Sequence, residues 1–192
     1  MVDSARMKHS LSRVLCHPNS LTLFRVGAVP LLILLLLFDN RLSAFLAAFV
    51  FTIAAITDYF DGYIARRYGL TSNLGKILDP LADKMLVSSA FIMLIPHGRV
   101  PAWMICLIIG RELAVTGLRN LITEHGDDAS ASLLGKYKTG FQIACLIPLL
   151  LHFPYFGVDL HSVGTVLLWM ALGITLWSGI DYFVRFWKYI EY

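Results

Sequence analysis

Residues 58–83 read DYFDGYIARRYGLTSNLGKILDPLAD and contain four aspartates in two closely spaced pairs. Asp58 and Asp61 are three residues apart, and Asp79 and Asp83 are four residues apart. Residues at these separations lie on one face of an α-helix, so the spacing predicts two helices that each carry an acidic face. Residues that favour a turn separate the two pairs: Gly69, Asn73 and Gly75. We therefore expect an antiparallel pair of helices whose acidic faces oppose each other.

The composition around this stretch is that of a membrane protein. Of the 192 residues, 57% are hydrophobic and 15% are charged, whereas soluble domains are roughly half apolar and a quarter charged. The three cysteines are far apart and form no metal-ligand pair or disulfide framework. No small-residue cleavage site follows the first apolar run, so we expect the chain to stay in the membrane whole.

Six apolar segments have the character of membrane spans. Crossing a bilayer as a helix takes about 20 largely apolar residues. Turn-favouring residues separate the six segments, which are residues 21–38, 42–66, 79–96, 100–123, 139–158 and 160–187. Residues 1–17 mix basic and apolar side chains and fit a short helix lying at the membrane interface. The expected fold is a single all-α membrane domain over residues 1–192, with six transmembrane helices.

The basic residues predict which way these helices cross the membrane. With a cytoplasmic N-terminus and six alternating spans, all but two of the 16 Lys and Arg residues fall on the cytoplasmic side. The two exceptions are Arg41 and Arg99. Because the cytoplasmic loops of membrane proteins are enriched in Lys and Arg, we expect both termini in the cytoplasm.

Ionisable residues also occur within or beside the apolar segments at cytoplasmic depth: Asp58, Asp61, Asp79, Asp83, Lys84, Arg111 and Glu112. A charge near a helix centre costs at least ~2.5 kcal/mol and normally faces a wet cavity or another charge. The pattern indicates a polar chamber that is open to the cytoplasm and serves as the active site. The alternative is that the aspartates only form ion pairs with neighbouring bases. It does not explain why both acidic pairs have helical spacing, or why Gly62 stands beside one of them.

The four aspartates predict a bound metal ion. Four carboxylates that meet in a small space repel one another unless a cation lies between them. Oxygen ligands with no Cys or His nearby favour hard ions such as Mg²⁺, Mn²⁺ or Ca²⁺ over zinc. We expect a divalent metal, Mg²⁺ or Mn²⁺, as the cofactor.

The spacing D-x₂-D-G-x₂-A-R-x₈-G-x₃-D-x₃-D resembles the signature of the CDP-alcohol phosphatidyltransferase family, and all eight fixed positions match. This resemblance implies that Asp58, Asp61 and Asp79 hold a pair of divalent metal ions. It implies that Asp83 lies near the metals and acts as the catalytic general base. Contacts with the CDP group of the lipid substrate are implied for a further set: Asn19, Thr22, Gly62, Arg66 and Ser72.

The implied reaction is a direct displacement at the lipid-side phosphorus of a CDP-lipid, with release of CMP. Two metal ions and an arginine neutralise the pyrophosphate so that a hydroxyl can approach. Asp83 accepts the proton of the attacking alcohol. No serine or cysteine nucleophile is required, and no spacing in the sequence suggests one.

Basic residues in the second half of the chain indicate that the acceptor alcohol carries a phosphate. Arg111 and Arg119 are eight residues apart, about two helical turns, and so lie on related helical faces. Lys136 and Lys138 stand at the start of the fifth span. The four bases together fit a phosphate separate from the reacting one. For Arg119 and Lys136, contact with lipid headgroups is the alternative.

Two further patterns, R-E-x₅-L-R at residues 111–119 and G-K-x-K-T at residues 135–139, resemble the bacterial glycerol-phosphate branch of the family. This branch implies CDP-diacylglycerol and sn-glycerol 3-phosphate as substrates, and phosphatidylglycerol phosphate and CMP as products, in phospholipid biosynthesis. It also implies a homodimer in the inner (plasma) membrane of a bacterium. The active site would be cytoplasmic, the surroundings would be membrane lipids, and there would be no nucleic-acid partner.

Two alternatives stay open at the level of the sequence. A sibling transferase would use another acceptor. Serine or phosphatidylglycerol would leave the basic residues without a role, but inositol phosphate would not. A cation transporter would also use intramembrane aspartates, yet it would show charged or broken segments at mid-membrane. The last two apolar segments are uninterrupted and the acids gather on one side, which favours the enzyme.

Overall fold

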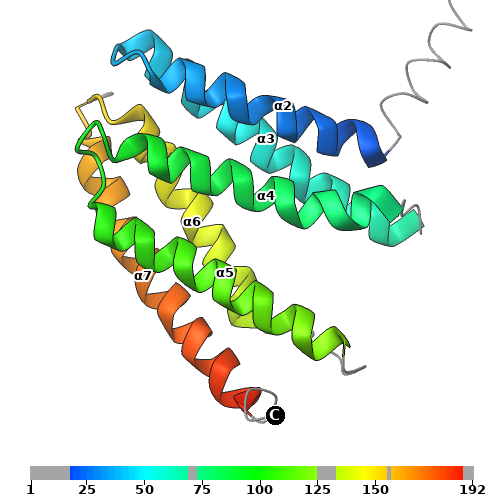
Figure 1. The fold of residues 1–192 in the computed structure, drawn as a ribbon. Helices are drawn as coiled ribbons and strands as arrows, with labels where there is room; N and C mark the ends of the chain where they lie inside the picture. The colour runs from blue at the N-terminus through cyan, green and yellow to red at the C-terminus, as the bar shows by residue number, and fades with distance from the viewer. Residues whose placement is uncertain (1–17, 69–72, 125–132, 155–156, 188–192) are drawn as a thin grey trace, which may run out of the picture. The chain divides into compact units, whose positions relative to one another are not determined.

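The computed structural model describes residues 18–68, 73–124, 133–154 and 157–187 (Figure 1). Within these ranges the side chains of some residues lie outside the description: 18–23, 58–68, 73–80, 83, 124, 133–134 and 136. The described backbone forms six α-helices and no strand: α2 (Pro18–Leu36), α3 (Arg41–Tyr68), α4 (Asn73–Leu94), α5 (Ala102–Glu124), α6 (Leu133–Leu151) and α7 (Leu160–Arg185). The prediction of an all-α fold is confirmed. The expected interfacial segment at residues 1–17 and Gly69 of the expected turn lie outside the described residues. The prediction of a turn at Asn73 and Gly75 is wrong, because both residues lie in the first turn of α4.

The chain divides into two compact units, Met1–Ala90 and Phe91–Tyr192. In the first unit α2 packs along α3. Small side chains dominate the buried face of α3, since Ala44, Ala47, Ala48 and Ala54 are all at most 4% exposed. Small residues let two helix backbones approach closely, which is the usual way that helices pack in a membrane.

A capped turn sets the start of α3. The Ser43 backbone N–H donates a hydrogen bond to Asn40 Oδ1 at 2.8 Å. Asparagine is among the best residues at this position, because its side chain satisfies a backbone N–H that has no partner within the helix. The connection between α2 and α3 is therefore short, as the apolar pattern predicts.

In the second unit α7 packs against both α6 and α5. The contact with α6 is close at Gly164, where an added Cβ would lie 2.6 Å from Leu149 Cγ and 3.0 Å from the Leu149 backbone nitrogen. The contact with α5 includes a cluster of buried side chains: Val115, Leu118, Ile122 and Tyr182. Gly164 thus sets how closely α6 and α7 can pack.

The chain leaves α6 at Leu151, although the apolar run continues to residue 158. Pro154 has no backbone N–H for a helical hydrogen bond, and it disfavours helical geometry in the preceding residue. Gly157 follows with a φ of +78°, a conformation that suits glycine. Asp159 then caps α7 by accepting a hydrogen bond from the His161 N–H at 3.1 Å. The turn signals, and not the apolar run, set the helix ends here.

Large apolar side chains are exposed on helices of both units. Leu34 and Phe49 of the first unit are 57% and 55% exposed, and Trp177 and Val184 of the second are 68% and 71% exposed. Among the described residues one helix, α7, is both long and apolar enough to cross a membrane. Four other helices contain shorter apolar stretches: Phe24–Leu36, Arg41–Thr57, Lys84–Leu94 and Tyr137–Leu151.

Candidate active site

The four aspartates of the sequence motif all lie within helices. α3 carries Asp58 and Asp61 in its C-terminal half, and α4 carries Asp79 and Asp83 in its N-terminal half. Because each helix is continuous across its pair, residues three and four apart stand on the same helical face. The aspartate side chains lie outside the described part of the structure, so the opposition of the two faces stays a prediction.

The residues expected to contact CDP are divided between two helices and a connection. Gly62 and Arg66 lie on α3, just beyond the first aspartate pair. Asn19 and Thr22 lie in the first two turns of α2. Ser72 lies outside the described residues. The side chains of this set are not described, and their contacts with a nucleotide stay predictions.

The donor chemistry of the aspartate motif fits a divalent metal. Carboxylate oxygens are the ligands that Mg²⁺ and Mn²⁺ take in proteins, whereas sulfur ligands select other metals. Elsewhere, the side chains that the structure describes form no group of three or more His, Cys, Asp or Glu residues that could hold a metal. That the four aspartates of α3 and α4 hold the cofactor stays a prediction.

In the second unit, Glu112 of α5 brings together two of the predicted acceptor-binding residues. Its Oε1 accepts a hydrogen bond from Arg111 Nη1 at 3.2 Å and another from Lys138 Nζ of α6. The side chains of Arg111, Glu112 and Lys138 are only 7%, 15% and 12% exposed. Charges buried to this degree need an oppositely charged partner. Glu112 is that partner for both cations, so the three side chains form one ion-pair cluster. Two cations and one carboxylate give this cluster a net positive charge.

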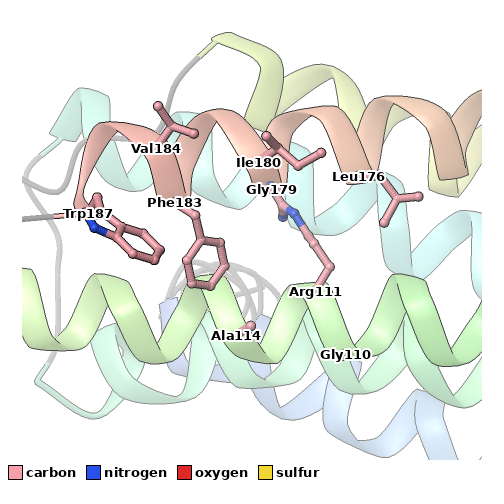
Figure 2. Close-up of a pocket in the computed structure, with 9 residues that line it drawn as sticks. All are labelled: Gly110, Arg111, Ala114, Leu176, Gly179, Ile180, Phe183, Val184 and Trp187. Carbon is pink, nitrogen blue, oxygen red and sulfur yellow. The ribbon is translucent and has the colours of Figure 1, made fainter. Parts of the chain in front are cut away.

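Residues of α7 hold Arg111 from the other side. Ser178 Oγ accepts a hydrogen bond from Arg111 Nη2 at 2.7 Å. The next residue, Gly179, leaves room for the arginine, because an added Cβ would lie 2.9 Å from Arg111 Cγ. Figure 2 shows the Arg111 side chain extending from α5 to α7 beside Gly179. The guanidinium is therefore fixed between two helices.

Gln142 extends the polar contacts one turn beyond Lys138 on α6. It is 3% exposed, and its Nε2 donates a hydrogen bond to Thr175 Oγ1 of α7 at 3.2 Å. Polar contacts therefore connect α5, α6 and α7 within an apolar interior. Gln142 and Thr175 are not among the site residues predicted from the sequence. Their spacing from Lys138 and Gly179, four residues in each case, is the signal that could have found them.

Arg119 lies apart from this cluster. Eight residues along α5 correspond to about 12 Å from Arg111. Its guanidinium carbon is 5.9 Å from the ring centroid of Tyr182 of α7, which is a cation–π distance. Lys136 lies on α6, but its side chain is not described. The structure therefore joins Arg111 with Lys138 and places Arg119 against an aromatic ring.

A groove of about 380 Å³ lies between α5 and α7. Apolar side chains form most of its walls, and Figure 2 shows Phe183 of α7 pointing toward Ala114 of α5. Arg111 is the one charged residue that lines it among the residues the structure describes. Because a small phosphorylated alcohol needs several polar partners, the groove is not suited to bind the acceptor.

Known proteins match this chain along most of its length. Residues 15–177 match the family described as CDP-alcohol phosphatidyltransferase. A Bacillus subtilis (strain 168) protein is 42% identical over 186 residues, which cover 91% of this chain and 96% of that protein. A Rickettsia typhi (strain ATCC VR-144 / Wilmington) protein is 41% identical, covering 86% of this chain and 94% of its own. A Shigella flexneri serotype 5b (strain 8401) protein is 37% identical, covering 86% and 91%. All three are named CDP-diacylglycerol–glycerol-3-phosphate 3-phosphatidyltransferase.

Proposed function

The chain belongs to the CDP-alcohol phosphatidyltransferase family, and from this we propose that it transfers a phosphatidyl group from CDP-diacylglycerol to sn-glycerol 3-phosphate. The products are phosphatidylglycerol phosphate and CMP. The observation that carries the proposal is 37–42% identity, over most of the chain, to proteins named for this reaction. The complete eight-position aspartate motif adds to it, because a relative that had lost activity would not need all four carboxylates.

Asp58, Asp61, Asp79 and Asp83 hold two divalent ions, Mg²⁺ or Mn²⁺. When bound, these ions neutralise the pyrophosphate and the charge that develops on it during displacement. Four carboxylates on two helices supply the hard oxygen donors that such ions take. Metal binding can be tested without turnover, because the binding of Mn²⁺ to the protein can be followed in a titration by the spectroscopic signal of the ion.

The protein residues orient the substrates and move one proton. Arg66 and Gly62 contact the CDP group, together with Asn19, Thr22 and Ser72. Asp83 accepts the proton of the acceptor hydroxyl as its oxygen forms a bond to the lipid-side phosphorus. The bond from that phosphorus to the CMP oxygen breaks, and CMP leaves with the electron pair.

Arg111 and Lys138 bind the phosphate of the acceptor, with Arg119 and Lys136 adding positive charge. Two features support this role. Arg111 and Lys138 form a fixed, mostly buried pair with a net positive charge after Glu112 is counted. Arginine and lysine also bind phosphate through strong charge-assisted hydrogen bonds. A sibling enzyme with serine as the acceptor would have no use for this pair.

The enzyme crosses the membrane six times, with its termini and its polar active-site chamber on the cytoplasmic side of a bacterial inner membrane. The apolar composition, the basic-residue asymmetry and the exposed apolar side chains support this topology. The enzyme acts as a homodimer surrounded by membrane lipids. Topology is tested with cysteines introduced at residues 39 and 98, which the proposed topology places on the side opposite the two termini. A membrane-impermeant thiol reagent should label both positions from that side and neither from the cytoplasmic side.

The activity is tested by incubating the purified protein with CDP-diacylglycerol, Mn²⁺ and sn-glycerol 3-phosphate. The proposal requires one CMP released for each phosphatidylglycerol phosphate formed. CMP release without a new lipid would indicate hydrolysis. Absence of both, in a protein that binds Mn²⁺ and remains folded, would refute the proposed function.

A further inference from the structure

Glu112 has a place in the structure that the proposed reaction does not by itself explain. It belongs to none of the metal or nucleotide contacts, yet it is the common partner of Arg111 and Lys138. Burying a carboxylate is unfavourable even when it is paired. It also lowers the positive charge of a cluster that is proposed to attract a phosphate. A site selected only for positive charge would lack this residue.

The contacts of Glu112 indicate that it fixes the positions of two cationic side chains. Lys138 comes from α6 and Arg111 from α5, and one oxygen of Glu112 joins them. A lysine ammonium sits on a flexible four-carbon stem, so a partner is needed to fix its position. Ser178 of α7 holds the other end of the Arg111 guanidinium at 2.7 Å. Arg111 and Lys138 are therefore held in a fixed relation by Glu112 and Ser178.

Donors remain on Arg111 beyond those that Glu112 and Ser178 accept. A guanidinium carries five N–H donors, of which Glu112 accepts one from Nη1 and Ser178 accepts one from Nη2. The Nε of Arg111 is buried and has no hydrogen-bond partner among the described residues. An unmet donor of this kind is unfavourable in a folded protein. A phosphate oxygen is an acceptor that would satisfy such donors.

We propose that Glu112 is a positioning residue for the acceptor, which with Ser178 holds Arg111 and Lys138 in the geometry that binds the glycerol phosphate group. This inference rests on the proposed function, because it assumes that the acceptor carries a phosphate. Glu112 does not touch the reacting atoms. It acts through the two cations and sets the affinity for the acceptor, not the chemical step.

The test is a kinetic comparison of Glu112→Gln with the unaltered enzyme and with Asp181→Asn. Asp181 is a matched control, because it also pairs with an arginine of the second unit, Arg185 at 3.2 Å, but lies outside the cluster. Loss of charge-assisted contacts in Glu112→Gln should raise the KM for glycerol 3-phosphate about tenfold. The KM for CDP-diacylglycerol and kcat should change less than about twofold, and Glu112→Asp should restore part of the loss.

The opposite result is equally clear. If the affinity for the acceptor phosphate depends only on net charge, Glu112→Gln raises the net charge of the cluster by one unit and the KM for glycerol 3-phosphate falls. A lower or unchanged KM, or an equal rise in both KM values, would overturn the positioning role. If Glu112→Gln does not fold, Ser178→Ala decides, since it removes the second anchor of Arg111. A KM for glycerol 3-phosphate within about 1.5-fold of the unaltered enzyme would then overturn the proposal.

The outcomes separate this inference from the proposed function. If the unaltered protein forms no phosphatidylglycerol phosphate, the function itself has failed. If it does form that product while Glu112→Gln and Ser178→Ala keep the acceptor KM, only the positioning role has failed.

Discussion

Gly179→Ala tests the packing that places Arg111 between two helices. An added Cβ at this position would lie 2.9 Å from Arg111 Cγ and 3.2 Å from its Nε, whereas ordinary contacts begin at 3.4 Å. The arginine must therefore move by about half an ångström, which stretches its 2.7 Å hydrogen bond to Ser178 toward ~3.2 Å, the limit of good geometry. A hydrogen bond to a charged group contributes about 1.5–3 kcal/mol, so its weakening by roughly 1 kcal/mol is expected.

That loss corresponds to about a fivefold increase in the KM for glycerol 3-phosphate. Stability should change little. Alanine gains about 1 kcal/mol over glycine within a helix, which offsets part of the 1–3 kcal/mol or so that overpacking costs. The assay pairs steady-state kinetics for both substrates with the thermal unfolding midpoint in detergent.

Gly173→Ala is the matched control on the same helix, because an added Cβ at Gly173 meets nothing within 4 Å. It should leave both KM values unchanged and stabilise the protein slightly. An unchanged KM for glycerol 3-phosphate in Gly179→Ala, or an equal rise in both KM values, would refute the role of this packing in placing Arg111.

Three other perturbations have defined outcomes. Asp83→Asn should abolish CMP release, with a fall in kcat of about 10²-fold or more and no loss of membrane insertion; residual turnover near the normal rate would remove Asp83 from the role of base. Chelation of divalent metal should stop the reaction and added Mg²⁺ or Mn²⁺ should restore it, whereas activity that persists in excess chelator would contradict the metal assignment. Asp159 caps α7, and a hydrogen bond from Ser162 holds the pKa of Asp159 below its ordinary value. The cap therefore stabilises the helix start above pH ~4 and is lost as the pH falls through the lowered pKa. The protection factors of the amides in the first turn of α7, which correct for the intrinsic exchange rate at each pH, should fall at low pH in the unaltered protein but not in Asp159→Asn; an equal fall in both would exclude this cap as the cause.

The sequence predicts the helices that carry the aspartates, because their spacing is a local property. A separation of three residues between Asp58 and Asp61 has structural meaning only within a helix, and α3 is continuous across both. The same holds for Asp79 and Asp83 on α4. How the two acidic faces meet depends on the connection between the helices, and helical spacing does not define it.

Helix ends follow turn chemistry more closely than hydropathy. The apolar run from Thr139 continues to residue 158, but α6 ends at Leu151 because Pro154 and Gly157 interrupt it. An apolar residue is equally suited to a helix or to a buried connection. Hydropathy also does not separate membrane spans from shorter apolar helices once charges are present. Of the described helices, α7 is long and apolar enough to cross a membrane, whereas α5 carries Arg111, Glu112 and Arg119 within its length.

Partners supplied by another helix are the part of the site that the sequence left open. The spacing of Arg111 and Arg119 indicates related faces of one helix, but it does not show which residues the neighbouring helices bring. Ser178 and Lys138 join Arg111 and Glu112, whereas Arg119 lies over the ring of Tyr182. These contacts depend on the packing of α5, α6 and α7, since the residues are 26 to 67 positions apart in the chain.

The most direct test of the assigned reaction is an acceptor competition. The purified enzyme, with CDP-diacylglycerol and Mn²⁺, is given equal concentrations of sn-glycerol 3-phosphate, inositol phosphate and serine, and the lipids formed are identified by mass spectrometry. The proposed function predicts phosphatidylglycerol phosphate as the dominant product, with an equal amount of CMP. Phosphatidylinositol phosphate or phosphatidylserine as the main product would contradict it.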